Sequence, residues 1–157
     1  MSGNLGYWEV SRTKRPDYSE DLKKKGLKIT KHRAAVLDIL EQSAQPVSAE
    51  QIFLELKERD VAVNLSTVYR VLETLAEKKL INKLSFAEDN RAFFEINHMI
   101  HRHYLVCVGC KKMLAIDYCP LEGYERALEE KTHFKISGHK LNIYGLCPVC
   151  QEKEQKK

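Results

Sequence analysis

Four of the five cysteines fall in two C-x-x-C pairs, Cys107 with Cys110 and Cys147 with Cys150. This spacing lets a tight turn point two thiolates at one ion, and two such turns complete the tetrahedral coordination that Zn²⁺ prefers. A redox-active pair is the alternative for a single C-x-x-C, but two pairs favour zinc. Because four thiolates leave no open position for a substrate, the pattern predicts a structural zinc site.

A second set of metal donors lies beside the first. His101 and His103 are two apart on an expected strand, so both rings face the same way. Glu122 falls in the first turn of an expected helix, and His139 precedes the last expected strand. These donors suit zinc, iron or manganese, but spacing does not show that they converge. Cys119, the fifth cysteine, is interpreted as a small buried hydrophobe and left out of the metal sites.

The second half of the chain must position these donors, and its pattern is α+β. Strands are expected at residues 104–107, 113–117, 134–137 and 141–146, with a helix over 120–132. Pro120 suits the first position of that helix. Residues 111–146 exceed the spacer of a simple zinc ribbon, so zinc would tie the ends of this domain together and stabilise its fold.

The first half has the element order of a winged helix. Helices are expected at residues 21–25, from Thr30 to about Ser43, and from Ser66 to about Lys79. Another helix is expected after the capping box formed by Ser48 and Gln51. Strands are expected to follow at residues 81–86 and 92–96. In helix-turn-helix proteins the last helix enters the major groove with its N-terminal residues at the base edges. Here that segment, residues 66–70, reads STVYR. The alternative is a three-helix core with an exposed Tyr-Arg pair.

Charge and hydropathy restrict the partners. The net charge is only +4, but residues 1–33 hold nine Lys or Arg against four acids. Such a stretch suggests a polyanionic partner, although a solvated tail and helix face would explain it equally well. No apolar run approaches the roughly 20 residues that cross a bilayer, and the N-terminus lacks the order of a signal peptide. A cytoplasmic protein without a membrane partner is expected.

In this order, the motifs resemble the ferric uptake regulator family of metal-dependent repressors. The match consists of residues 26–30 with Arg33, 47–50, 66–70, the His/Cys run 101–110 and 143–147, and it spans roughly residues 20–150. The resemblance implies a winged helix-turn-helix DNA-binding domain, a small α/β dimerisation domain with a four-cysteine zinc site, and repression by a homodimer at AT-rich palindromic operators. The segment 117–120 (DYCP) is more similar to the zinc uptake regulator branch than to iron-sensing members.

The composition of the chain suggests a division into four parts, and the closed four-thiolate site argues against an enzymatic role. The expected parts are a flexible basic arm over residues 1–17, a DNA-binding domain over 18–96, a hinge over 97–103 and a metal-binding dimerisation domain over 104–157. Double-stranded operator DNA is the expected partner, with no small-molecule substrate and no catalytic residue. Iron-sensing and peroxide-responsive regulators of the same family are the alternatives to a zinc sensor.

Two of the three metal sites of the family have matching residues in this chain, and the third does not. Its four-cysteine site matches directly, and its second site falls on His101, His103, Glu122 and His139, where Zn²⁺, Fe²⁺ or Mn²⁺ would be sensed. The third site, at the hinge, departs from the pattern because Pro46, Arg102, Tyr104 and Ala115 occupy ligand positions. The hinge site is therefore absent, or rebuilt from Glu95, His98 and His32.

DNA contacts are expected from both ends of the winged helix. Tyr69 and Arg70 would read the groove, while Lys28, Arg33 and Arg91 hold phosphates. The full set of expected contacts is Lys28, Arg33, Ser66, Thr67, Tyr69, Arg70 and Arg91.

A zinc deaminase would need a His-x-Glu ahead of Pro-Cys-x-x-Cys and an open zinc position, and neither is present. A zinc-stabilised module that binds protein instead of DNA is the other rival.

Overall fold

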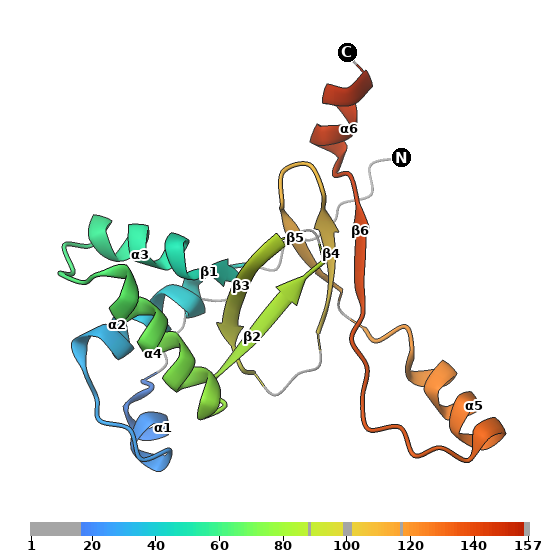
Figure 1. Cartoon of the computed structure of the whole chain (residues 1–157), viewed down its shortest axis with the longest axis horizontal. Coiled ribbons are helices and arrows are strands. Elements are labelled where there is room, and N and C mark those ends of the chain that lie inside the picture. Colours follow the sequence, from blue (N-terminus) through green and yellow to red (C-terminus); the bar gives the residue numbers. More distant parts are fainter. Residues whose placement is uncertain (1–16, 88, 99–101, 117, 156–157) are drawn as a thin grey trace.

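A computed structural model describes residues 17–155, apart from 88, 99–101 and 117. The described chain is α+β and contains two three-stranded sheets, with strand orders β1-β3-β2 and β5-β4-β6. Helices of the first half pack beside its sheet, whereas the helices of the second half extend away from theirs (Figure 1). Most of the expected basic arm lies outside the described residues. Across the described residues, no helix combines the length and apolar character needed to span a bilayer.

The first half is the predicted winged helix. Its elements are α1 (Ser19–Lys24), α2 (Lys31–Gln42), β1 (Val47–Ser48), α3 (Ala49–Glu58), α4 (Leu65–Glu77), β2 (Ile81–Phe86) and β3 (Asp89–Ile96). The Thr30 side chain accepts a hydrogen bond from the Arg33 amide, and Ser48 and Gln51 form a reciprocal capping box, so both predicted caps are confirmed. Helix α4 begins one residue before the expected Ser66, because Asn64 caps it.

Two features of this half were not predicted. The strand β1 is only two residues long, too short for an alternating pattern, and pairs with β3 opposite Phe93 and Phe94. The wing strand β3 begins at Asp89, earlier than the expected residue 92. The helices themselves are held by one apolar core. Leu37, Leu56 and Leu72 are fully buried within it, and each such side chain stabilises the fold by about 1.5–3 kcal/mol.

The second half is built on β4, the middle strand of its sheet. The elements are β4 (His103–Cys107), β5 (Met113–Ile116), α5 (Glu122–Thr132), β6 (Asn142–Gly145) and α6 (Pro148–Gln155). Strand β4 pairs antiparallel with β5 and parallel with β6. His103 is therefore the first residue of a strand.

Two expectations for this half were wrong, and one helix was not predicted. The helix α5 starts at Glu122, because Pro120 and Leu121 form a turn ahead of it. Residues 134–137 form no strand, and the amide of Ile136 donates to Glu129 Oε1 over 2.7 Å. Since α5 stands away from the sheet, this segment returns to β6 without a neighbouring strand to pair with (Figure 1). The helix α6 was missed, because residues 148–155 show little apolar periodicity.

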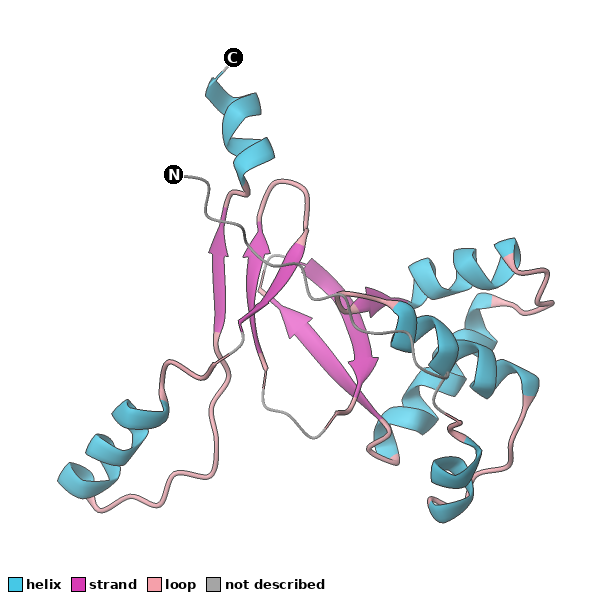
Figure 2. Cartoon of the chain, turned by 180° about the vertical axis from the view of Figure 1, so that it is seen from behind, coloured by secondary structure: helices cyan, strands magenta, loops and turns pink. Residues whose placement is uncertain are grey.

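The wing of the first domain packs against the second sheet (Figure 2). A second apolar core joins them, formed by Phe86, Phe93, Tyr104, Val106 and Met113. Three hydrogen bonds cross the same junction: Tyr104 Oη donates to Glu95, the Ala87 amide donates to Tyr144 Oη (2.8 Å), and the Met113 amide donates to Gln45 Oε1 (3.1 Å). The orientation of β4 is thus linked to that of the wing.

Candidate metal centres and DNA interface

The four cysteines of the two C-x-x-C pairs meet at one end of the second sheet. Cys107 closes β4, and Cys147 follows β6, which runs parallel to β4 with Cys107 opposite Gly145. The four sulfur atoms lie within 4.8 Å of one another. A Cβ atom at Gly109 would come within 3.0 Å of Cys150 Sγ, so the turn needs glycine for this close approach. The structure therefore brings together the predicted four-cysteine set.

The electrostatics of this cluster fit a divalent cation. Backbone amides of Cys110 and Cys147 point at Cys107 Sγ and lower the pKa of Cys107 to about 6. Hydrogen bonds to the neighbouring sulfurs raise the pKa of Cys150 to about 12. Four sulfurs this close cannot all ionise without a positive charge between them, and a bound Zn²⁺ would supply that charge. Four thiolate ligands would leave no open coordination position, as a structural centre requires.

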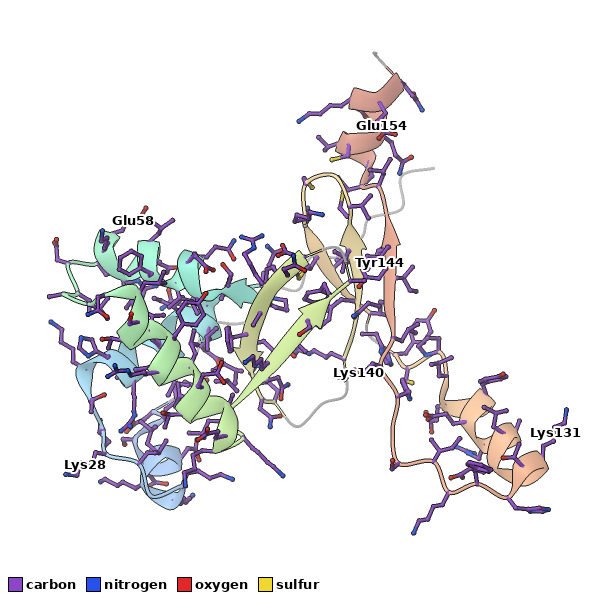
Figure 3. All side chains as sticks on the ribbon, in the orientation of Figure 1. Lys28, Glu58, Lys131, Lys140, Tyr144 and Glu154 are labelled. Atoms are coloured by element: carbon purple, nitrogen blue, oxygen red, sulfur yellow. The ribbon has the colours of Figure 1, made fainter. Side chains whose placement is uncertain are left out.

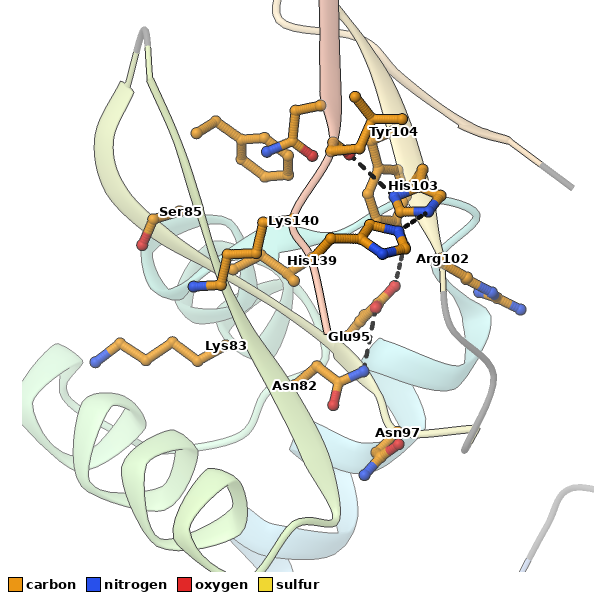
Figure 4. A pocket seen from close by; sticks show the side chains of 14 residues that line it. Asn82, Lys83, Ser85, Glu95, Asn97, Arg102, His103, Tyr104, His139 and Lys140 are labelled. Carbon is orange, nitrogen blue, oxygen red and sulfur yellow. Dashed lines mark hydrogen bonds between the residues drawn. The ribbon is translucent and has the colours of Figure 1, made fainter. Parts of the chain in front are cut away.

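A second donor cluster lies where β4 begins. His103 Nε2 and His139 Nε2 are 3.0 Å apart, and Cys119 Sγ is 3.4 Å from each of them. His103 is only 1% exposed. The two rings are stacked with centroids 4.8 Å apart, and Figure 4 shows them lying side by side at the edge of a cleft of about 410 Å³. Two imidazoles and one thiol therefore converge here.

The structure only partly assembles the regulatory site expected from the sequence. His103 and His139 come together, whereas His101 lies outside the described residues. Glu122 lines a pocket with Cys119 and His139, but its carboxylate pairs with Arg126 over 3.1 Å. Cys119, interpreted from the sequence as a small buried hydrophobe, is instead half-buried and lies against both imidazoles.

The proximity of Cys119 to His103 depends on the pairing of distant strands, which the sequence does not show. Strand β5 pairs with β4 so that Ile116 lies opposite His103. A residue soon after Ile116 therefore falls beside that histidine. Glu125 was also missed, and its Oε1 atom contacts His139 Nδ1 over 2.6 Å. The sequence alone gave no reason to prefer Glu125 over Glu122 as the acid beside His139, because that choice depends on the direction of α5.

Glu95, His98 and His32, the donors considered for a rebuilt hinge site, do not converge in the structure. Within the described part of the chain, metal donors gather only in the two clusters above. His32 Nε2 bonds the carbonyl oxygen of Ala62 over 2.9 Å. Glu95 instead accepts hydrogen bonds from Tyr104 Oη and, over 3.3 Å, from Asn82 Nδ2. The carboxylate is occupied by neighbouring donors because tyrosine stands where a metal ligand was expected.

The expected DNA-contacting side chains lie on the winged helix, away from the metal clusters. Ser66, Tyr69 and Arg70 are exposed near the start of α4, and Thr67 is half-buried with its amide capped by Asn64. Lys28 lies at the outer rim of the helical layer, well separated from Tyr144 of the second sheet (Figure 3). Arg33 is half-buried beside it, with Nη1 donating to the Lys28 carbonyl oxygen over 2.7 Å.

Two of these side chains are held by carboxylates. Tyr69 Oη donates to Glu50 Oε1 over 2.5 Å, which raises the pKa of Tyr69 and lowers that of Glu50. Arg91 pairs with Asp89 over 2.6 Å, and this contact lowers the pKa of Asp89 to about 2. Both acids therefore keep their negative charge at neutral pH and hold the groups expected to reach DNA.

Comparison with known proteins identifies this architecture. The profile of the Ferric uptake regulator family matches residues 24–144, most of the chain. The chain belongs to the ferric uptake regulator family. The Ferric uptake regulation protein of Legionella pneumophila is 42% identical over 134 residues, which cover 85% of this chain and 98% of that protein. Members of this family are metal-dependent transcription regulators that bind DNA and act as dimers.

Solved structures of the family share the fold. The Vibrio cholerae ferric uptake regulator superposes with a TM-score of 0.75 at 29% identity, covering 83% of this chain and 100% of that one. The Helicobacter pylori regulator, with three functional metal-binding sites, gives a TM-score of 0.74 at 26% identity, covering 84% and 87%. The predicted order of a winged-helix domain followed by a dimerisation domain with a cysteine cluster is thereby confirmed. The zinc uptake regulator branch remains a prediction.

Proposed function

We propose that the protein is a zinc-responsive transcriptional repressor that binds, as a metal-loaded homodimer, to AT-rich palindromic operators of metal-homeostasis genes. The observation that carries the proposal is the mixed nitrogen and sulfur donor cluster at the start of β4. It lies one residue from Tyr104, which hydrogen-bonds the wing. A metal ion there would act on the junction between the sensing and DNA-binding parts. The proposed place of action is the cytoplasm.

The choice of zinc rests on the thiol. Soft sulfur ligands favour Zn²⁺ over Mn²⁺, which prefers oxygen donors. Iron is the second candidate, supported by the names of relatives such as the Legionella protein and by the Francisella tularensis regulator, solved with iron and 29% identical to this chain. The four-cysteine cluster is proposed to hold a separate structural zinc ion.

The division into functional parts is proposed as the sequence suggested it. A DNA-binding domain over residues 18–96 agrees with the end of β3 at Ile96, and a dimerisation domain over 104–157 nearly coincides with the start of β4 at His103. Residues 97–103 would be the hinge between them. Homodimer formation is supported by the exposed apolar side chains of the second sheet and by α5, which buries none of its own residues.

A mobility-shift titration tests the function. An AT-rich palindrome is expected to bind the chelator-treated protein weakly and the metal-supplemented protein tightly, with Zn²⁺ effective at the lowest free concentration among Zn²⁺, Fe²⁺ and Mn²⁺. Arg70→Ala is expected to weaken binding by about 1–3 kcal/mol if it reads a base. Iron giving the tighter response would make the protein an iron sensor. DNA binding that ignores metal, or no DNA binding at all, would favour the protein-interaction module.

Tyr104→Phe is expected to weaken the link between metal and DNA. The variant keeps the ring, whose centroid lies 6.1 Å from that of Phe86, and removes only the hydroxyl that donates to Glu95. We expect unchanged metal affinity, while the metal-dependent gain in operator affinity falls by about fivefold or more, within the usual range of coupling energies. Calorimetric metal titration and mobility shifts measure the two quantities separately.

The control for this variant is Tyr118→Phe. Tyr118 is 74% exposed and lies near the metal cluster in sequence, so loss of its hydroxyl should leave both quantities unchanged. An unaltered metal response in Tyr104→Phe would show that the hydrogen bond to Glu95 carries no coupling.

A further inference from the structure

We infer that Cys119, and not Glu122, ligates the regulatory metal, in a site whose protein donors are His103 Nε2, His139 Nε2 and Cys119 Sγ. The inference rests on the proposed function, because it assigns the ligands of the ion that the repressor would sense. It departs from the carboxylate-containing set that the family resemblance implies, and it places a thiolate directly on the sensed ion.

The outer contacts of the two histidines set their tautomers. His103 Nδ1 faces the carbonyl oxygen of Leu141 over 3.2 Å, and His139 Nδ1 faces Glu125 Oε1 over 2.6 Å. Carbonyl and carboxylate oxygens accept hydrogen bonds, so each Nδ1 carries the proton. A neutral imidazole protonated at Nδ1 has its lone pair on Nε2. Both Nε2 atoms are therefore free of a proton when the rings are neutral and can bind a metal.

The distances within the cluster are those of atoms around one ion. Zinc bonds of about 2.0–2.1 Å to nitrogen and 2.3 Å to sulfur, at tetrahedral angles, separate two nitrogens by about 3.3 Å and nitrogen from sulfur by about 3.6 Å. The observed separations are 3.0 Å between the Nε2 atoms and 3.4 Å from each to Cys119 Sγ. Two lone pairs directed at one point repel unless a cation lies between them. An expansion of only a few tenths of an ångström would admit zinc.

The two nearby acids have different positions. The Glu122 side chain is 73% exposed and pairs with Arg126, itself 72% exposed, as neighbours one turn apart on the helix surface. The Glu125 side chain is only 26% exposed and contacts His139. A carboxylate on the far nitrogen of a metal-bound histidine orients the ring and increases its basicity. Glu125 is thus a positioning residue outside the ligand set.

Donor chemistry determines which ions the site prefers. Two imidazoles and a thiolate suit Zn²⁺ and Co²⁺, whereas Mn²⁺ and Mg²⁺ prefer carboxylate, carbonyl and water oxygens. With Glu122 as a ligand in place of Cys119, this discrimination would be weaker. The sulfur atom is therefore the specificity-determining donor of the site.

Cobalt spectroscopy on the full chain tests the assignment. The four-cysteine site is first filled with zinc, and Co²⁺ is then added while the bound zinc is monitored. The wild type is expected to develop a near-ultraviolet thiolate-to-cobalt charge-transfer band. Cys119→Ser should lose the band and bind Co²⁺ at least tenfold more weakly, whereas Glu122→Gln should retain the band and the affinity. Glu125→Ala should keep the band with affinity lowered about 10–100-fold, as for other outer-shell partners.

A second variant at position 119 distinguishes loss of the sulfur ligand from misfolding of the segment that carries it. Cys119→Asp supplies an oxygen donor, so it should bind Co²⁺ without the band and should bind Mn²⁺ better, relative to Co²⁺, than the wild type does. Retention of the band in Cys119→Ser with the zinc content unchanged, or loss of Co²⁺ binding in Glu122→Gln, would overturn the assignment.

Mobility shifts on the same samples separate this inference from the proposed function. If Cys119→Ser loses the band but the wild type binds operator DNA regardless of metal, the ligand assignment holds and the repressor function fails. If the band persists in Cys119→Ser and wild-type DNA binding still requires metal, the function holds and the assignment fails.

Discussion

Replacing Cys107 with serine is expected to remove one zinc ion per chain and to unfold the second domain at temperatures where the wild type is folded. This domain has little apolar core of its own. Its buried apolar residues, such as Val106 and Met113, share a cluster with the wing, and neither α5 nor α6 buries a residue. Structural zinc contributes about 10–16 kcal/mol to folding in zinc-finger peptides, so its loss outweighs any single packing contact here.

Zinc analysis and calorimetric unfolding measure this effect. The matched control is Cys119→Ser, the same chemical change at a cysteine outside the four-cysteine cluster, which should retain the structural ion and the melting transition of the domain. The winged helix should keep its own transition in both variants, because its core from α2, α3 and α4 is separate. A Cys107→Ser protein with full zinc content and an unchanged melting profile would exclude a structural role for the cluster.

The parts of the fold that follow local rules were predictable from the sequence. The caps at Thr30 and Ser48 each use residues three positions apart, and this spacing is visible in any single sequence. The C-x-x-C pairs were equally clear, because two such pairs supply the four thiolates of one tetrahedral zinc site. Local signals also identified the wing, although its second strand began earlier than expected.

The regulatory donor set was harder because it depends on pairing between distant segments. His103 meets Cys119 through the register of β4 with β5, and His139 through the parallel pairing of β4 with β6. Neither register is encoded in the spacing of the donors themselves. The direction of α5 then decides which of its acids, Glu122 or Glu125, contacts a histidine. A family pattern favoured Glu122, and the geometry of this chain favours a different set.

The exposed face of the second sheet leads to the other large expected effect. Leu105 lies opposite both Leu114 on β5 and Ile143 on β6. These side chains are 40%, 62% and 44% exposed, respectively, and form an apolar stripe across the three strands. Leu114→Asp should leave the monomer folded, because this position is open to water. In a homodimer interface it would bury an unpaired charge, which costs about 3–5 kcal/mol and weakens dimerisation about 100-fold or more.

Loss of the dimer should abolish operator binding without removing metal. A palindromic operator presents two half-sites about one helical turn apart, so tight binding needs two recognition helices at a fixed separation. Leu114→Asp is therefore expected to sediment as a monomer, keep its zinc, and lose the mobility shift at concentrations that saturate the wild type. Leu54→Asp, a comparable change at a side chain 58% exposed on α3 of the first domain, should remain dimeric. If Leu114→Asp stays dimeric at low micromolar concentration, the apolar stripe is not the interface, and the exposed side chains of α5 become the next surface to test.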